Sequence, residues 1–139
     1  VKLKARFETI SKDPTIILDV GHNPHAAAVL AQNVEKLPST GKLVAVFGML
    51  ADKDMIDVIK LMNPHVDEWF ISGLPKPRGA DCELLHRTML EAGVDHSKIK
   101  RFETIESAFD AARQEASITD KILVFGSFVT VTAVLAKLA

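Results

Sequence analysis

Short apolar runs typical of buried strands alternate along this chain with segments whose apolar residues recur at helical spacing. About six runs alternate with about five helices, and this alternation is typical of a mostly parallel sheet covered by helices on both faces. We therefore predict an α/β fold, a Rossmann-like three-layer sandwich. The predicted strands cover residues 6–10, 16–20, 43–47, 66–72, 99–102 and 122–125, and the predicted helices cover residues 24–37, 55–62, 84–92, 105–116 and 131–138.

Length and composition limit what the chain can be. Its 139 residues suit one domain, and the net charge of −1 gives no reason to expect a nucleic acid or a membrane surface as partner. The one cysteine, Cys82, excludes an internal disulfide framework and fits a reducing compartment, so we expect a cytoplasmic location. The most apolar segment, residues 122–136, is shorter than the roughly 18 residues of a membrane span. The chain begins with Val, which favours processing or a fragment of a longer polypeptide.

Residues 16–28 predict a strand, a tight turn and a helix in that order. The strand is apolar except for Asp19, as expected when both faces of a parallel sheet are buried. A glycine then permits the turn, and an Asn-Pro pair suits the start of a helix. Ligands of open α/β sheets bind beyond the carboxyl ends of the strands, so Asp19 and His22 are candidate site residues.

Two other interpretations of this turn stay open. Asp19 can simply accept backbone N–H groups, with His22 a solvated loop residue. Alternatively, Asp19, His22 and His25 stand three residues apart and could ligate a metal ion. Against a metal site, His25 would have to point back from the first helical turn, and no Cys or Glu joins the group. We therefore assign no metal site.

Three predicted strands end in polar turns that contain glycine, at residues 19–22, 48–53 and 126–127. Right-handed crossovers place these ends on one edge of the sheet, which is the candidate active face. The sequence has no G-x-G-x-x-G dinucleotide motif, no G-x-x-x-x-G-K-[ST] phosphate loop and no G-x-S-x-G nucleophile elbow. The chain therefore offers half of a catalytic site.

The same turns carry a resemblance to a known family. Residues 18–27, Leu-Asp-Val-Gly-His-Asn-Pro-His-Ala-Ala, resemble the Asp-x-Ala-His-Asn-Pro signature of folylpolyglutamate synthases, including the bacterial bifunctional type that is also a dihydrofolate synthase. Gly21 stands where that signature has Ala. The resemblance covers essentially the whole chain, but only the carboxyl-terminal domain of the family. Further pieces fall in the family's order at residues 6–7, 46–54, 77–80 and 126–127.

The resemblance implies an ATP-dependent ligase related to the Mur peptide ligases, with residues 1–139 as the single carboxyl-terminal glutamate-ligase domain of a two-domain enzyme. Such an enzyme phosphorylates the carboxylate of dihydropteroate or a folate, and the amino group of L-glutamate attacks the acyl phosphate. The family's amino-terminal domain holds the phosphate loop, the magnesium ligands, a carbamylated lysine and most of the folate site. We therefore expect ATP with Mg²⁺ bound mainly by that domain, and an isolated chain without activity.

The resemblance also implies roles for five residues. Arg6 and Asp19 match an ATP-contacting arginine and aspartate, and His22 matches a signature histidine near the reacting phosphate or the incoming glutamate. Asp19 and His22 are thus the catalytic candidates. Lys53 and Ser127 occupy places comparable to glutamate-binding residues of the wider ligase group. The chemistry is compatible, because a guanidinium binds phosphate and an ammonium group suits a carboxylate. Structural roles stay open for Lys53 as a solvated lysine and for Ser127 as a helix cap.

A noncatalytic α/β module that binds a small ligand or a partner protein is the alternative function. An unrelated α/β sugar- or nucleotide-binding domain is a third possibility. An upstream G-x-x-x-x-G-K-[ST] motif in the same reading frame would favour the ligase, and a stand-alone start codon would favour the module.

Overall fold

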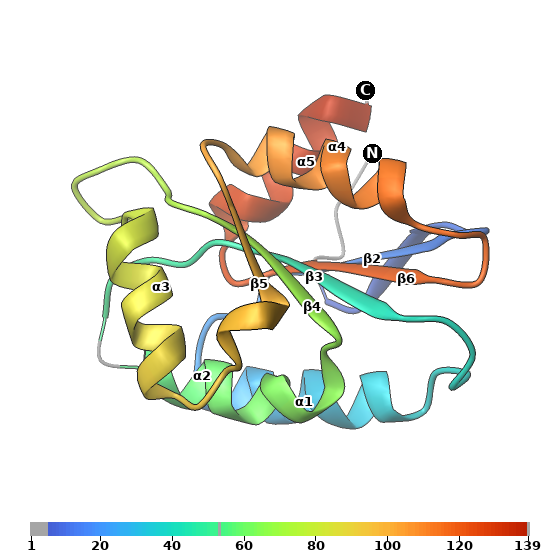
Figure 1. Cartoon of the computed structure of the whole chain (residues 1–139), viewed down its shortest axis with the longest axis horizontal. Helices are drawn as coiled ribbons and strands as arrows, with labels where there is room; N and C mark the ends of the chain where they lie inside the picture. The colour runs from blue at the N-terminus through green and yellow to red at the C-terminus, as the bar shows by residue number, and fades with distance from the viewer. Residues whose placement is uncertain (1–5, 53, 139) are drawn as a thin grey trace.

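A single six-stranded sheet lies between two layers of helices in the computed structural model, which describes residues 6–52 and 54–138 (Figure 1). Helices α1, α2 and α3 cover one face, and α4 and α5 cover the other. No helix in the described ranges is long and apolar enough to cross a membrane. The strands are β1 (Glu8–Ser11), β2 (Thr15–Asp19), β3 (Leu43–Phe47), β4 (Glu68–Ser72), β5 (Ile99–Phe102) and β6 (Lys121–Phe125). The helices are α1 (Pro24–Glu35), α2 (Met55–Met62), α3 (Cys82–Glu91), α4 (Ile105–Glu115) and α5 (Phe128–Leu138), with short 3-10 helices at Asn63–His65 and His96–Lys98.

The strands lie in the order β1-β2-β6-β3-β4-β5. β1 pairs antiparallel with β2 at one edge, and all other neighbours are parallel. The last strand of the chain, β6, lies between β2 and β3, so that Asp19 and Phe47 both stand level with Phe125. The predicted α/β fold with a mostly parallel sheet is confirmed, and the carboxyl ends of β2, β6 and β3 are adjacent.

The core has two parts because successive side chains of a strand point to opposite faces of the sheet. On the face of α1, α2 and α3, the rings of Phe47, Trp69 and Phe125 pack together, with centroids 5.3, 4.8 and 6.0 Å apart in the three pairs. On the other face, Phe70 and Phe109 belong to the core beneath α4 and α5. Burial on both faces explains why β3 and β6 are buried at every position.

Local signals set most helix starts as predicted. Asn23 Oδ1 accepts a hydrogen bond from Ala26 N–H at 2.8 Å, and α1 begins at Pro24. The apolar repeats that begin at Leu84 and Val131 belong to α3 and α5, and these helices begin at Cys82 and, directly after the candidate cap Ser127, at Phe128. Helical periodicity detects buried positions, whereas Phe128 is 60% exposed and gives no such signal. The strand predicted at residues 66–72 starts at Glu68, where its pairing with β3 begins.

Candidate functional site

Asp19, the last residue of β2, is 2% exposed and has both carboxylate oxygens engaged. Oδ2 accepts a hydrogen bond from Phe7 N–H at 3.0 Å, and Oδ1 accepts one from Gly21 N–H at 2.7 Å. Burial raises the pKa of the Asp19 carboxyl above its ordinary value, while the two hydrogen bonds and the positive charge of Arg6 oppose the rise. Asp19 therefore has the backbone-accepting role that the sequence left open, and its predicted contact with ATP stays a prediction.

Arg6 and His22 present exposed side chains at the same strand end. His22 Nδ1 lies 3.4 Å from the carbonyl oxygen of Val20. Arg6 Nη1 lies 3.3 Å from the point where a Cβ would stand on Gly21, and Arg6 makes no ion pair with any described residue. Both side chains can therefore meet a ligand that approaches from solvent.

The geometry of this turn does not favour the alternative metal site. Among residues 6–52 and 54–138, no three His, Cys, Asp or Glu side chains come together in a way that could hold a metal ion. His25 is exposed in the first turn of α1, while the Asp19 oxygens face backbone N–H groups.

Ser127 lies in the turn after β6 and is 3% exposed. Its Oγ accepts a hydrogen bond from Val129 N–H at 3.0 Å and so caps the start of α5. The Thr130 hydroxyl donates to the carbonyl oxygen of Gly48 at 2.8 Å, which ties α5 to the turn after β3. The sheet register therefore brings the turns after Asp19, Phe47 and Phe125 to one edge, as the crossovers predicted.

Lys53, the second residue predicted to bind glutamate, lies outside the described residues. The turn on either side of it is held in two ways. Asp52 Oδ1 accepts a hydrogen bond from Asp54 N–H at 2.7 Å, and Ala51 N–H donates to the Arg78 carbonyl oxygen at 2.8 Å. The turn after β3 is thus joined to the proline-containing loop that follows β4.

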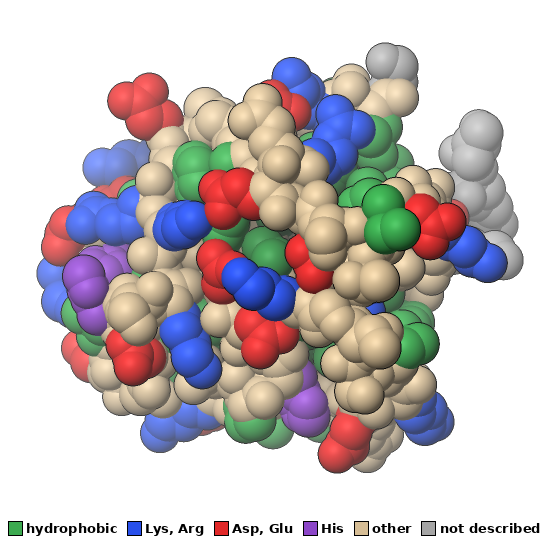
Figure 2. Space-filling view, turned by 45° about the vertical axis from the view of Figure 1, so that its right-hand side comes forward, with side chains coloured by type: hydrophobic (Ala, Val, Ile, Leu, Met, Phe, Trp, Pro, Cys, Tyr) green, Lys and Arg blue, Asp and Glu red, His purple; other side chains and the backbone are tan. Residues whose placement is uncertain are grey.

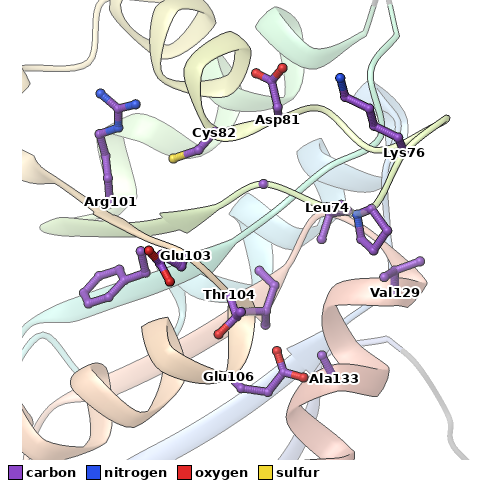
Figure 3. Close-up of a pocket in the computed structure, with 14 residues that line it drawn as sticks. Leu74, Lys76, Asp81, Cys82, Arg101, Glu103, Thr104, Glu106, Val129 and Ala133 are labelled. Atoms are coloured by element: carbon purple, nitrogen blue, oxygen red, sulfur yellow. The ribbon is translucent and has the colours of Figure 1, made fainter.

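A pocket of about 790 Å³ lies at the carboxyl ends of β4 and β5 (Figure 3). This volume is in the range of small-ligand sites. Its lining combines the buried side chains of Leu74 and Ile105 with charged groups around them. A Cβ on Gly48 would lie 2.9 Å from Leu74 Cδ2 and 2.9 Å from Ile105 Cδ1, so the pocket adjoins the turn after β3. None of the described predicted site residues lines it.

The charged side chains of this pocket are largely unpaired. Lys76, Glu103 and Glu106 make no ion pair with any residue in the described part of the chain. Arg101 Nη2 is paired with Glu83 Oε2 at 3.0 Å. Sequence reasoning missed these residues because the walls come from separate segments. The available signals were the loop with two prolines and the helix starts that follow β4 and β5.

The opposite edge of the sheet, at the amino ends of the strands, is closed by ion pairs. Glu68 lies 3.0 Å from Lys42 and 3.8 Å from Lys100, and Lys100 lies 2.8 Å from Glu115. Figure 2, which turns that side of the molecule forward, shows acidic and basic side chains next to one another in the middle of the view. The two edges therefore differ in whether their charges are satisfied within the chain.

Comparison with known protein families identifies the family of this chain. The family model described as Mur ligase, glutamate ligase domain, matches residues 5–128. The chain belongs to the Mur ligase glutamate ligase domain family. The family predicted from the turn motifs is thereby confirmed.

Relatives of this Mur ligase domain carry one recurrent name. Dihydrofolate synthase/folylpolyglutamate synthase of Escherichia coli K12 is 40% identical over 134 residues, which make up 96% of this chain and 30% of the relative. E. coli FolC in complex with DHPP and ADP matches with a TM-score of 0.89 and 38% identity, over 98% of this chain and 31% of that one. A bifunctional folylpolyglutamate synthase/dihydrofolate synthase with Mn, AMPPNP and L-glutamate bound matches with a TM-score of 0.87 and 39% identity, over 99% of this chain and 32% of that one. The chain thus spans about 30% of the length of the curated relative.

Proposed function

We propose that this chain is the carboxyl-terminal, glutamate-adding domain of a dihydrofolate synthase/folylpolyglutamate synthase, an ATP-dependent ligase of folate metabolism. The observation that carries the proposal is the 40% identity to the E. coli enzyme along 96% of the chain. Because the chain spans 30% of that relative, the proposal includes an amino-terminal ATPase domain of the same polypeptide. The noncatalytic module is less favoured, since relatives aligned along nearly the whole chain carry ligase names.

In the proposed reaction, the γ-phosphoryl group of ATP passes to the carboxylate of dihydropteroate or a folate, giving an acyl phosphate and ADP. The amino group of L-glutamate then attacks the acyl carbon, phosphate leaves, and the nitrogen loses a proton as the amide forms. The ligands bound in one related structure, Mn, AMPPNP and L-glutamate, support this set of reactants. We assign the magnesium ion mainly to the amino-terminal domain, a cytoplasmic location to the enzyme, and neither nucleic acid nor membrane as a partner.

Three residues are assigned to the ATP site at the end of β2. Arg6 is assigned to a phosphate of ATP, because its guanidinium is exposed and has no ion pair with a described residue. His22, exposed in the same turn, is assigned to the reacting phosphate or the incoming amine, whose proton an imidazole can accept. Asp19, whose carboxyl is influenced by the positive charge of Arg6, is assigned to the ATP site together with Arg6.

Two residues are assigned to L-glutamate. An ammonium group and the N-terminus of a helix both suit a carboxylate, so Lys53 and Ser127 are the proposed contacts. Support for Ser127 is its position at the start of α5, beside the turn after β3. In a closed enzyme, the glutamate would lie between these turns and the amino-terminal domain.

The proposal is tested by separating the chain from its partner. The 139-residue chain alone should neither hydrolyse ATP nor ligate glutamate, while the two-domain polypeptide should do both. In the two-domain protein, His22→Ala should slow glutamate ligation by about 100-fold or more. His65→Ala, a histidine at the opposite edge of the sheet, is the matched control and should leave the rate unchanged. ATP hydrolysis by the chain alone, or full ligation by the His22→Ala variant, would contradict the proposal.

A further inference from the structure

We propose that Asp19 is a positioning residue for Arg6. Its carboxylate ties the segment that carries Arg6 to the turn after β2, and Gly21 leaves the room in which the Arg6 guanidinium approaches that turn. We call the carboxylate with its two backbone donors, Phe7 N–H and Gly21 N–H, the Asp19 clamp. The inference rests on the proposed function only for the ligand of Arg6, a nucleotide phosphate.

The Asp19 clamp holds a backbone conformation that is otherwise unfavourable. Phe7 has a φ of 45°, in the left-handed region that a bulky residue rarely adopts. It immediately precedes β1, so the sheet ladder does not fix it. The hydrogen bond from Phe7 N–H to Asp19, together with packing of Phe7 against the core on the α1 side, holds this conformation. Because Phe7 directly follows Arg6, the backbone conformation of Phe7 sets the direction in which the Arg6 side chain points.

Gly21 makes the approach of Arg6 possible. A Cβ at this position would lie 2.8 Å from Ala26 Cβ, 2.9 Å from Asp19 Oδ1 and 3.3 Å from Arg6 Nη1. Ordinary contacts between carbon atoms are about 3.5–4.0 Å, so a methyl group would force its neighbours apart. The related signature has Ala here, and the glycine of this chain therefore permits a tighter packing of guanidinium, carboxylate and helix.

The same geometry leaves the donors of Arg6 free. Arg6 and Asp19 attract each other, as the effect of Arg6 on the Asp19 carboxyl shows, yet they do not close into an ion pair. Both Asp19 oxygens accept hydrogen bonds from backbone N–H groups, so the N–H groups of the Arg6 guanidinium remain available to a ligand. A guanidinium that is already directed loses less conformational freedom when it binds phosphate.

A double-mutant cycle on nucleotide affinity tests this inference. ADP binding to the two-domain polypeptide would be measured by calorimetry for Asp19→Asn, Arg6→Ala and the double variant. Asp19→Asn should weaken ADP binding about tenfold when Arg6 is present, and less than about twofold when Arg6 is absent. Gly21→Ala should show the same dependence on Arg6. Equal weakening in both backgrounds would overturn the proposal, because Asp19 would then act on the ligand or the fold without Arg6.

Asp120 provides a matched control for the structural role of such a carboxylate. It too accepts two backbone hydrogen bonds, from Lys42 N–H and Ser117 N–H, each at 2.9 Å, but at the opposite edge of the sheet. Asp120→Asn should leave ADP affinity unchanged. If it weakened ADP binding as much as Asp19→Asn does, the effect would come from losing any backbone-accepting carboxylate, and the proposal would be overturned.

Amide hydrogen exchange of the 139-residue chain separates the clamp from the proposed function. Asp19→Asn should speed exchange at Phe7 or at Gly21, because an amide oxygen can replace only one of the two carboxylate oxygens that accept from these donors. Asp120→Asn should speed exchange at neither. If the two-domain protein binds no ADP, the proposed function fails while the exchange still reports on the clamp. Unchanged exchange at both amides in Asp19→Asn would overturn the clamp itself.

Discussion

A single methyl group at Gly126 should do large damage to the strand-end turns. Gly126 has a φ of +114°, and a Cβ there would lie 2.4 Å from the Gly48 carbonyl oxygen and 2.8 Å from Phe47 Cε1. One of these neighbours is backbone, and the other is a fully buried ring. Neither can move aside as the end of a flexible side chain can, so Gly126→Ala must shift the turn after β3 or displace Phe47.

The magnitude follows from comparison with Gly93, which also has a positive φ, +93°, but nothing within 4 Å of its Cβ position. Gly93→Ala should be destabilising only through the left-handed backbone, by about 1–2 kcal/mol. Gly126→Ala adds the overpacking of a filled core, typically about 1–3 kcal/mol, for a total of about 2–5 kcal/mol.

Thermal unfolding of the purified chain measures both variants under the same conditions. With an unfolding entropy of about 2.1 cal/mol/K per residue, each kcal/mol lowers Tm by about 3–4 °C in a chain of this length. We expect a loss of about 3–7 °C for Gly93→Ala and about 7–17 °C for Gly126→Ala. If the two variants lowered Tm by the same amount, Gly126 would not be packed against Gly48 and Phe47 as tightly as the structure shows.

Two further outcomes are expected at buried charged groups. Since burial raises the pKa of Asp19, its contribution to stability is fully present below the pKa of the unfolded chain and is lost as the pH rises through the folded pKa. The free energy of unfolding of the wild type, relative to Asp19→Asn, should therefore fall from acidic to neutral pH in urea titrations, and a constant difference would contradict this. Lys121 is 8% exposed, and its Nζ donates to the carbonyl oxygens of Pro38 at 2.7 Å and Thr40 at 2.6 Å. Lys121→Met should lower the free energy of unfolding by about 1–3 kcal/mol, measured by urea unfolding against the exposed control Lys60→Met, which should change it by less than about 0.5 kcal/mol.

The strands and helices were predictable because the signals for each, an apolar run, a helical repeat or a capping residue, lie within a few residues of one another. Asn23 before α1 and Thr104 before α4 provide such signals through side chains that accept helix N–H groups. The order of the strands in the sheet could not be predicted in this way. β6 lies between β2 and β3 because distant apolar runs pair with one another, and the runs at 16–20, 43–47 and 122–125 are too alike to say which neighbour each takes.

The candidate site was predictable in outline and not in contacts. Crossover handedness alone placed the turns after Asp19, Phe47 and Phe125 at one edge. It could not reveal that Phe7 N–H would reach the Asp19 carboxylate, because that bond depends on the antiparallel return of β1. The pocket beside this edge was missed for a similar reason: its walls meet only after β4, β5 and α5 have packed.

The contrast between the two edges of the sheet has a physical reason in the proposed function. At the amino ends, Glu68 and Lys100 belong to a chain of ion pairs, and the buried Lys121 is held by two carbonyl groups, so that edge is complete by itself. At the carboxyl ends, Arg6 and the pocket's Lys76 have no ion pair with a described residue, and water must satisfy them. Exposed charges of this kind add little to the stability of the isolated domain, but a nucleotide or a second domain that excludes water would strengthen their interactions. The charged side chains that contribute least to folding are therefore the ones best suited to binding.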